Sequence, residues 1–125
     1  MLISAEGPAP TSDVWRRYSR PALWPGWAPQ IRRVVTDAEV VAPEVTGTVH
    51  GPLLLRIPFR ILAVDPERQR WTWRVGVGPL GVVLDHGVDP ARAGGSRAWA
   101  RVHAPTLLVA PYAPLARLAL RRLVA

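Results

Sequence analysis

Apolar and polar residues alternate with a period of two through most of residues 44–103. This period sends successive side chains to opposite faces of an extended strand, so each strand has one apolar face. Turn signals separate the strands at Asp65-Pro66-Glu67, at Gly78-Pro79 and between Asp89-Pro90 and Gly94-Gly95. The pattern predicts an antiparallel meander whose apolar face another element must cover.

The alternation defines the side chains that should point inward, and one of them is a histidine. In the last strand, residues 96–103, Trp99 alternates with Arg97 and Arg101. We expect this face to point outward, because two unpaired buried arginines would be costly. The predicted inward residues are Leu55, Ile57, Phe59, Ile61 and Ala63, then Trp71, Trp73, Val75 and Val77, then Val82, Leu84, His86 and Val88, and finally Ala98, Ala100 and Val102.

The segments on both sides of the meander complete the predicted order of elements. Residues 2–7 are expected to form a strand, and a helix follows it to about Ser19. Residues 23–29 contain prolines, a glycine and two tryptophans, which predicts a second short and compact helical turn. Near the C-terminus the apolar spacing changes to three and four residues, which indicates a helix over about 114–124. Its apolar face is predicted to contain Leu108, Tyr112, Leu115, Ala119 and Leu123.

The final helix is the only predicted element long enough to cover the sheet. We therefore expect an α+β fold in which a curved antiparallel sheet of about six to seven strands encloses the C-terminal helix. A gap between such a helix and sheet, lined by apolar side chains, is a typical site for a small molecule. The 125 residues fit one domain over 1–125.

Composition excludes several classes of function. No apolar run reaches the roughly 20 residues that span a membrane, and Met1–Glu6 lack the features of a secretory signal. We therefore expect a soluble cytoplasmic protein without membrane insertion. The absence of cysteine excludes disulfides and thiolate sites, and the absence of lysine excludes a Schiff base and a P-loop. The net charge is +7, but the arginines are dispersed and match no nucleic-acid motif, so nucleic-acid binding is not expected.

Four short motifs occur in a specific order along nearly the whole chain. They are Val14-Trp15 followed by Trp24-Pro25-Gly26-Trp27-Ala28-Pro29, then Gly47, then Asp65-Pro66 with Arg70-Trp71-Thr72-Trp73, and then Leu84–Pro90 with Gly95-Ser96-Arg97. In this order and spacing they resemble the polyketide cyclase/dehydrase-like branch of the START-type helix-grip (SRPBCC) superfamily. The resemblance implies a helix-grip fold with a hydrophobic cavity.

The chemistry stays open, because this superfamily includes cyclases, dehydratases, lipid carriers and hormone receptors. Our leading hypothesis is the cyclisation or dehydration of an aromatic or polyketide-type substrate without a cofactor. The alternative is a non-catalytic binder or carrier of an apolar ligand, and a third hypothesis is a subunit of a heteromeric assembly. The chain is short for the family, and Pro111 and Pro114 interrupt the start of its last helix. We therefore expect the cavity either to be shallow or to be completed by a second copy in a homodimer.

His86 is the candidate catalytic residue, because a histidine on an apolar strand face could move a proton to or from a substrate. The alternative is a structural histidine bonded to the backbone or to a tyrosine. Asp85 belongs to the opposite face of the strand, where we expect it to face solvent or pair with an arginine. His50 and His103 lie 36 and 17 residues from His86, a spacing that gives no support for a metal site.

The predicted cavity has a sheet side and a helix side. Trp71 and Trp73 are either simple core residues or a flat aromatic wall for a polycyclic ligand. Trp27 is expected to gate the mouth or to stabilise its turn. The sheet side should contain Leu55, Ile57, Phe59, Trp71, Trp73, Leu84 and His86, and the helix side Tyr112, Leu115 and Ala119.

Overall fold

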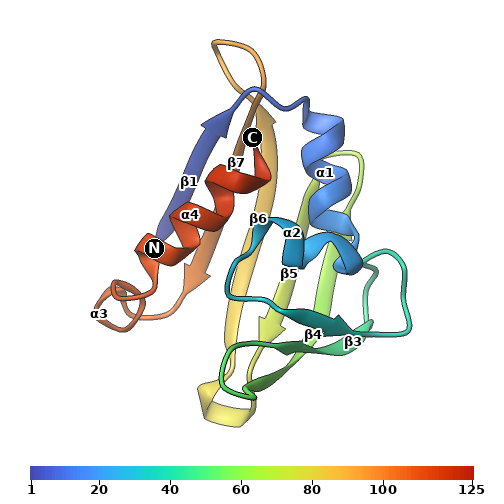
Figure 1. The fold of residues 1–125 in the computed structure, drawn as a ribbon, viewed down its shortest axis with the longest axis vertical. Coiled ribbons are helices and arrows are strands. Elements are labelled where there is room, and N and C mark those ends of the chain that lie inside the picture. The colour runs from blue at the N-terminus through green and yellow to red at the C-terminus, as the bar shows by residue number, and fades with distance from the viewer.

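A seven-stranded antiparallel sheet forms the centre of the computed structural model, which describes residues 1–125 (Figure 1). The strands lie in the order β1-β7-β6-β5-β4-β3-β2. From β2 to β7, strands that follow one another in sequence are also neighbours in the sheet, as the turn signals predicted. The strands are β1 (Leu2–Gly7), β2 (Arg33–Val35), β3 (Thr46–His50), β4 (Arg56–Asp65), β5 (Arg70–Val75), β6 (Val82–Pro90) and β7 (Ser96–His103).

The two longest helices lie on one side of this sheet (Figure 1). In Figure 1 the last helix crosses the concave side of the sheet, and the first helix lies beside it. The predicted α+β helix-grip arrangement is therefore confirmed, with the short helical segments after β1. The helices are α1 (Thr11–Ser19), η1 (Pro21–Leu23), α2 (Trp24–Trp27), η2 (Gly78–Leu80), α3 (Thr106–Val109) and α4 (Ala113–Leu123). None of them combines the length and the apolar character that crossing a bilayer requires.

The first helix delivers a tyrosine to the centre of the core. Val14 and Tyr18 are four residues apart, so they share one face of α1, and both are fully buried. Burying a large apolar side chain stabilises a fold by about 1.5–3 kcal/mol. This pair therefore attaches α1 firmly to the sheet and places the Tyr18 ring above β5 and β6.

The core face of α4 contains the predicted Ala119 and Leu123, but it differs from the prediction elsewhere. Leu108 and Leu115 are 75% and 36% exposed, while Ala113, Ala116 and Leu120 are buried. The chain breaks its helix around Pro111, so Leu108 belongs to α3 and the period of α4 does not extend through it. Small alanines on the buried face let the helix backbone approach the sheet closely.

The apolar alternation of β4 also changes partway along the strand. The pairing with β5 shifts by one residue between Ile61 and Ala63, which is a β-bulge at Leu62. The prediction that Ala63 points inward was wrong, because the bulge sends it to the exposed face and turns Val64 toward the core. The prediction for β7 was right: Ala98, Ala100 and Val102 are buried, and Arg101 is exposed on the opposite face.

Candidate ligand-binding cavity

A cavity of about 560 Å³ lies between the concave face of the sheet and α4. Of the 28 residues that line it, 24 are hydrophobic. Both its size and its lining are typical of sites for small organic molecules. A second hollow, beside Gly7 and Gly95, is open and has only two hydrophobic residues among seven, so it is a poor candidate.

The strand register brings distant residues of the sequence into two rows that face the cavity. In one row Trp71 pairs with His86, and His86 pairs with Ala100. In the next row Trp73 pairs with Leu84, and Leu84 pairs with Val102. Directly opposed residues of antiparallel strands project on the same face of the sheet. The small residues of β7 therefore leave space on this face beside the larger side chains of β5 and β6.

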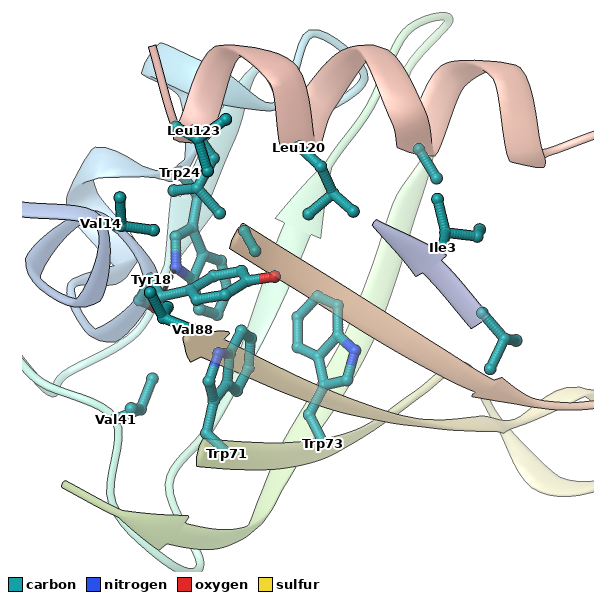
Figure 2. Close-up of a cluster of buried hydrophobic side chains, with 14 of the residues drawn as sticks. Ile3, Val14, Tyr18, Trp24, Val41, Trp71, Trp73, Val88, Leu120 and Leu123 are labelled. Carbon is teal, nitrogen blue, oxygen red and sulfur yellow. Dashed lines mark hydrogen bonds between the residues drawn. The ribbon is translucent and has the colours of Figure 1, made fainter. Parts of the chain in front are cut away.

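Aromatic rings form one end of this cavity. The His86 ring stacks on Trp71 with a centroid distance of 3.9 Å and an interplanar angle of 11°, and Trp71 stacks in turn on Trp24 at 5.5 Å. Tyr18 meets His86 edge-on at 5.6 Å. Figure 2 shows Trp71 and Trp73 rising from the sheet beneath the Tyr18 ring, with Leu120 of α4 above. These contacts hold His86 in one orientation.

Burial determines the protonation state of His86. Its side chain is 6% exposed, and burial lowers its pKa from 6.5 to about 3, against smaller opposing effects of the Trp71 carbonyl and Asp85. The imidazole is therefore neutral at physiological pH. Its Nδ1 lies 3.3 Å from the Trp71 carbonyl oxygen, which can only accept, so Nδ1 carries the hydrogen. The remaining ring nitrogen, Nε2, is an acceptor without a hydrogen bond to the protein.

Tyr18 is a cavity residue that the sequence did not reveal as one. Its hydroxyl donates to the Trp99 carbonyl oxygen at 3.0 Å, and burial raises its pKa well above the ordinary value of 10. The hydroxyl thus stays protonated and is already used in a structural hydrogen bond. The sequence signal was an aromatic residue on the apolar face of a helix, which is equally typical of plain core.

Several polar atoms at the cavity wall have no partner within the protein. Both indole N–H groups, those of Trp71 and Trp73, are buried and make no hydrogen bond, and Gln30 Oε1 is in the same situation. Gln30 Nε2 donates to the Tyr112 hydroxyl at 3.0 Å, which leaves that hydroxyl free to donate. Burial raises the pKa of Tyr112, although the bond from Gln30 partly opposes the rise. Protein atoms cover the two indole nitrogens and Gln30 Oε1, so the Tyr112 hydroxyl is the donor of this group that a bound molecule can reach.

Nearly all of the predicted site residues meet around this one cavity. His86, Trp71, Trp73, Leu84, Ile57, Leu55, Trp27, Tyr112 and Leu115 all line it. Phe59 does not line it: the ring is 4% exposed and packs against Trp24 and Trp73, behind the cavity wall. Trp27 is half-buried, and its indole N–H donates to the Arg17 carbonyl oxygen, which fixes the turn as well as the wall.

The other histidines and Asp85 lie apart from the cavity. Asp85 accepts a hydrogen bond from Thr72 at 2.6 Å and contacts His103 at 2.7 Å on the outer face of the sheet. Burial raises its pKa, but the bonds from Thr72 and His103 outweigh this effect and lower it. Asp85 lies on the outer face and is partly exposed, as expected, but its partner is His103 of the neighbouring strand and not an arginine. The molecule contains no group of three acidic, histidine or cysteine side chains that could hold a metal ion.

Comparison with protein families gives one match that covers almost the entire chain. A family described as polyketide cyclase / dehydrase and lipid transport matches residues 3–125. No curated protein matches the sequence.

Solved structures share the fold at low sequence identity. The protein XoxI from Bacillus cereus has a TM-score of 0.77 and 12% identity, covering 99% of this chain and 92% of that one. Ara h 8.0201 has a TM-score of 0.74 and 12% identity, covering 98% and 93%. DynU16, from the dynemicin biosynthetic locus, has a TM-score of 0.77 and 18% identity, but this chain matches only 45% of its length. At such identities the similarity establishes the fold alone.

Proposed function

Because the chain belongs to the polyketide cyclase / dehydrase and lipid transport family, we propose that it binds an apolar small molecule of the aromatic or polyketide type in this cavity. The observation that carries the proposal is a largely hydrophobic cavity with stacked aromatic rings at one end and two polar atoms available to a ligand, the Tyr112 hydroxyl and His86 Nε2. A flat, polycyclic ligand with a few carbonyl or phenolic oxygens would match both features.

The aromatic rings and the polar atoms have separate roles in this proposal. Packing of the ligand against the aromatic end of the cavity would supply most of the affinity, since flat apolar surfaces bury well against aromatic rings. The Tyr112 hydroxyl is a donor, and His86 Nε2 is an acceptor. A few polar atoms in an apolar pocket orient a ligand and provide specificity.

Catalysis of cyclisation or dehydration is the second candidate function, and His86 Nε2 favours it. This nitrogen lacks a protein partner, so it could accept a proton from a carbon acid or hydroxyl of a bound polyketone. Burial weakens that role, since a pKa of about 3 makes the neutral imidazole a poor base. At neutral pH only about one molecule in ten thousand would carry the proton needed for an acid step. Binding is therefore better supported than catalysis.

Titration with emodin, an aromatic polyketide, tests the binding proposal. We expect emodin to quench the tryptophan fluorescence saturably, because Trp71 and Trp73 line the cavity. Leu84→Trp should abolish binding by filling the cavity from β6. Leu62→Trp is the matched control, since Leu62 is 39% exposed at the β4 bulge and does not line the cavity. Equal affinity in the two variants would rule out this site.

A His86→Gln variant distinguishes the hypothesis of a carrier from the hypothesis of a catalyst. With a linear aromatic polyketone as substrate, a catalyst should form the cyclised product faster than buffer does, and His86→Gln should lose that rate while it still binds emodin. A carrier should show no acceleration in either protein. A wild-type rate that survives in His86→Gln would exclude His86 as the proton-transfer group.

A further inference from the structure

Three loop segments at the mouth of the cavity expose leucines to solvent. They are residues 51–55 between β3 and β4, residues 76–81 between β5 and β6, and residues 104–112 between β7 and α4, which together we name the apolar rim. Figure 1 shows them toward the lower left of the molecule. The exposed fractions are 96% for Leu53, 94% for Leu54, 83% for Leu80, 89% for Leu107 and 75% for Leu108. Clusters of exposed large apolar side chains are typical of interaction surfaces.

The apolar rim frames the cavity itself. Pro52 and Leu55 of the first segment and Leu108 and Tyr112 of the third line it, while the strand ends beside the second segment contribute Val75 and Val82. A ligand that passes through the mouth therefore moves between these three segments. Whatever covers the rim also controls access to the cavity.

The first segment holds its leucines outward in a costly conformation. Leu53 and Leu54 have backbone φ angles of +57° and +63°, in the left-handed region that side chains other than glycine seldom adopt. Strain of this kind is commonly retained where it serves function. Here it presents two adjacent leucines to solvent beside an apolar cavity.

Charge is distributed unevenly around the rim. The three segments contain no charged residue, and the acidic residue closest to them in sequence, Asp85, is already paired with His103. Behind the first segment, Arg33, His50 and Arg56 form a row across β2, β3 and β4. Desolvation and the charges of both arginines lower the pKa of His50, so these groups lie close together. The uncharged segment 51–55 therefore has two arginines behind it in the sheet.

We propose that the apolar rim docks the mouth of the cavity on a membrane surface that contains anionic lipids. The leucines would enter the acyl boundary of the leaflet, and Arg33 and Arg56 would lie at the phosphate headgroups. An apolar ligand could then pass between leaflet and cavity without crossing water. A second copy of this chain fits the rim less well, because its row of cations would meet the same row.

Docking by loop tips differs from what the sequence suggested. From the sequence we expected no membrane insertion, and we expected the C-terminal helix to cover the sheet. The structure keeps the apolar face of α4 in the core. The rim needs no spanning helix, and its three segments are too far apart in sequence to be recognised as one surface.

Co-sedimentation with vesicles tests the proposal. We expect the wild type to sediment with vesicles of phosphatidylglycerol and phosphatidylcholine, less with phosphatidylcholine alone, and less at high salt. A variant with Leu54→Ser, Leu80→Ser and Leu107→Ser, one change per segment, should lower the bound fraction about tenfold. These side chains are exposed, so folding should be unaffected, as circular dichroism can verify.

Matched control variants distinguish the contribution of the leucines to vesicle binding from that of the arginines. The control for the leucines is Val40→Ser with Leu62→Ser and Leu118→Ser, which changes exposed apolar residues outside the rim. Arg33→Gln with Arg56→Gln should reduce the preference for phosphatidylglycerol, whereas Arg68→Gln with Arg92→Gln should not.

Three outcomes would overturn the proposal: no sedimentation of the wild type, equal sedimentation of the rim variant and its control, or a dimer in analytical ultracentrifugation that the rim variant dissociates. The last outcome would make the rim a contact between copies. Leu84→Trp, which fills the cavity, should still bind vesicles. Failure of ligand binding and failure of membrane docking are therefore distinguishable.

Discussion

His86 lies between the rings of Trp71 and Tyr18, and its neutral state has a measurable consequence for stability. The unfolded chain binds a proton at this histidine near pH 6.5, while the folded chain resists it until about pH 3. Across that interval the unfolded state holds more protons than the folded state, so acid favours unfolding. The full stability is present above pH 6.5 and is lost as the pH falls.

We expect the free energy of unfolding to fall by roughly 2 kcal/mol between about pH 7 and about pH 5 because of His86. Denaturant titrations at the two pH values should show this loss in the wild type and a clearly smaller loss in His86→Gln, whose side chain does not titrate. An equal loss in both proteins would mean that His86 already binds its proton in the folded state.

The Tyr112 hydroxyl, which is free to donate, should discriminate between ligands. We expect Tyr112→Phe to weaken the binding of emodin, which has acceptor oxygens, by about three- to tenfold, the usual contribution of one neutral hydrogen bond. Anthracene has the same three-ring outline and no oxygen, so its affinity should change less. Calorimetric titration of both compounds checks this, and parallel losses would assign Tyr112 a role in shape alone.

At the scale of elements, the seating of α4 depends on a glycine in β1. A Cβ at Gly7 would overlap the Val124 carbonyl oxygen and lie 2.7 Å from the Val124 Cγ2 atom, just beyond the end of α4. That same carbonyl accepts a hydrogen bond from the Ala9 amide at 3.0 Å, and the Arg17 guanidinium donates to the Leu123 carbonyl at 2.8 Å. Hydrogen bonds therefore hold the end of α4 against α1 and against the segment that follows β1.

Gly7→Ala should destabilise the fold by about 1–3 kcal/mol, because the backbone of α4 must move to admit one methyl group. Gly26→Ala is the control: nothing lies within 4 Å of a Cβ there, and an alanine within α2 should be neutral or slightly stabilising. Thermal unfolding of both variants measures the difference. Equal melting temperatures would show that α4 tolerates displacement from β1.

Two elements show where periodicity stops predicting the fold. Along β4 the alternation suggested one unbroken inward face. Because of the bulge at Leu62, Val64 points toward the core and Ala63 does not. Along the C-terminal segment the spacing suggested one helical face from Leu108 to Leu123, but the chain breaks between α3 and α4. A bulge or a break is stabilised by packing against neighbouring strands, and local sequence does not record that packing.

At the scale of the whole molecule, cavity occupancy and stability should be linked. A ligand that binds only the folded state adds about 2.7 kcal/mol when its concentration is one hundred times Kd. For a chain of this size we expect emodin at that level to raise Tm by roughly 10 °C. Differential scanning calorimetry of the wild type and Leu84→Trp checks this, and the same rise in both proteins would place the ligand outside the cavity.

The sequence by itself determined the strand meander, the covering helix and most of the residues that line the cavity. These follow from side-chain alternation, turn residues and helical spacing, which are properties of neighbouring residues in the chain. His86, Trp71 and Trp73 could be assigned to inward faces for this reason, and so could the outward face of Trp99.

Only the tertiary structure decided what those residues can do. It placed Tyr18 and Trp24 against the His86–Trp71 stack and Phe59 behind the cavity wall. It paired Asp85 with His103. It also lowered the pKa of His86 to about 3 and gathered three leucine-bearing loops around one mouth. Burial and contact between distant segments set all of these properties, and both exist only after the sheet has closed around α4.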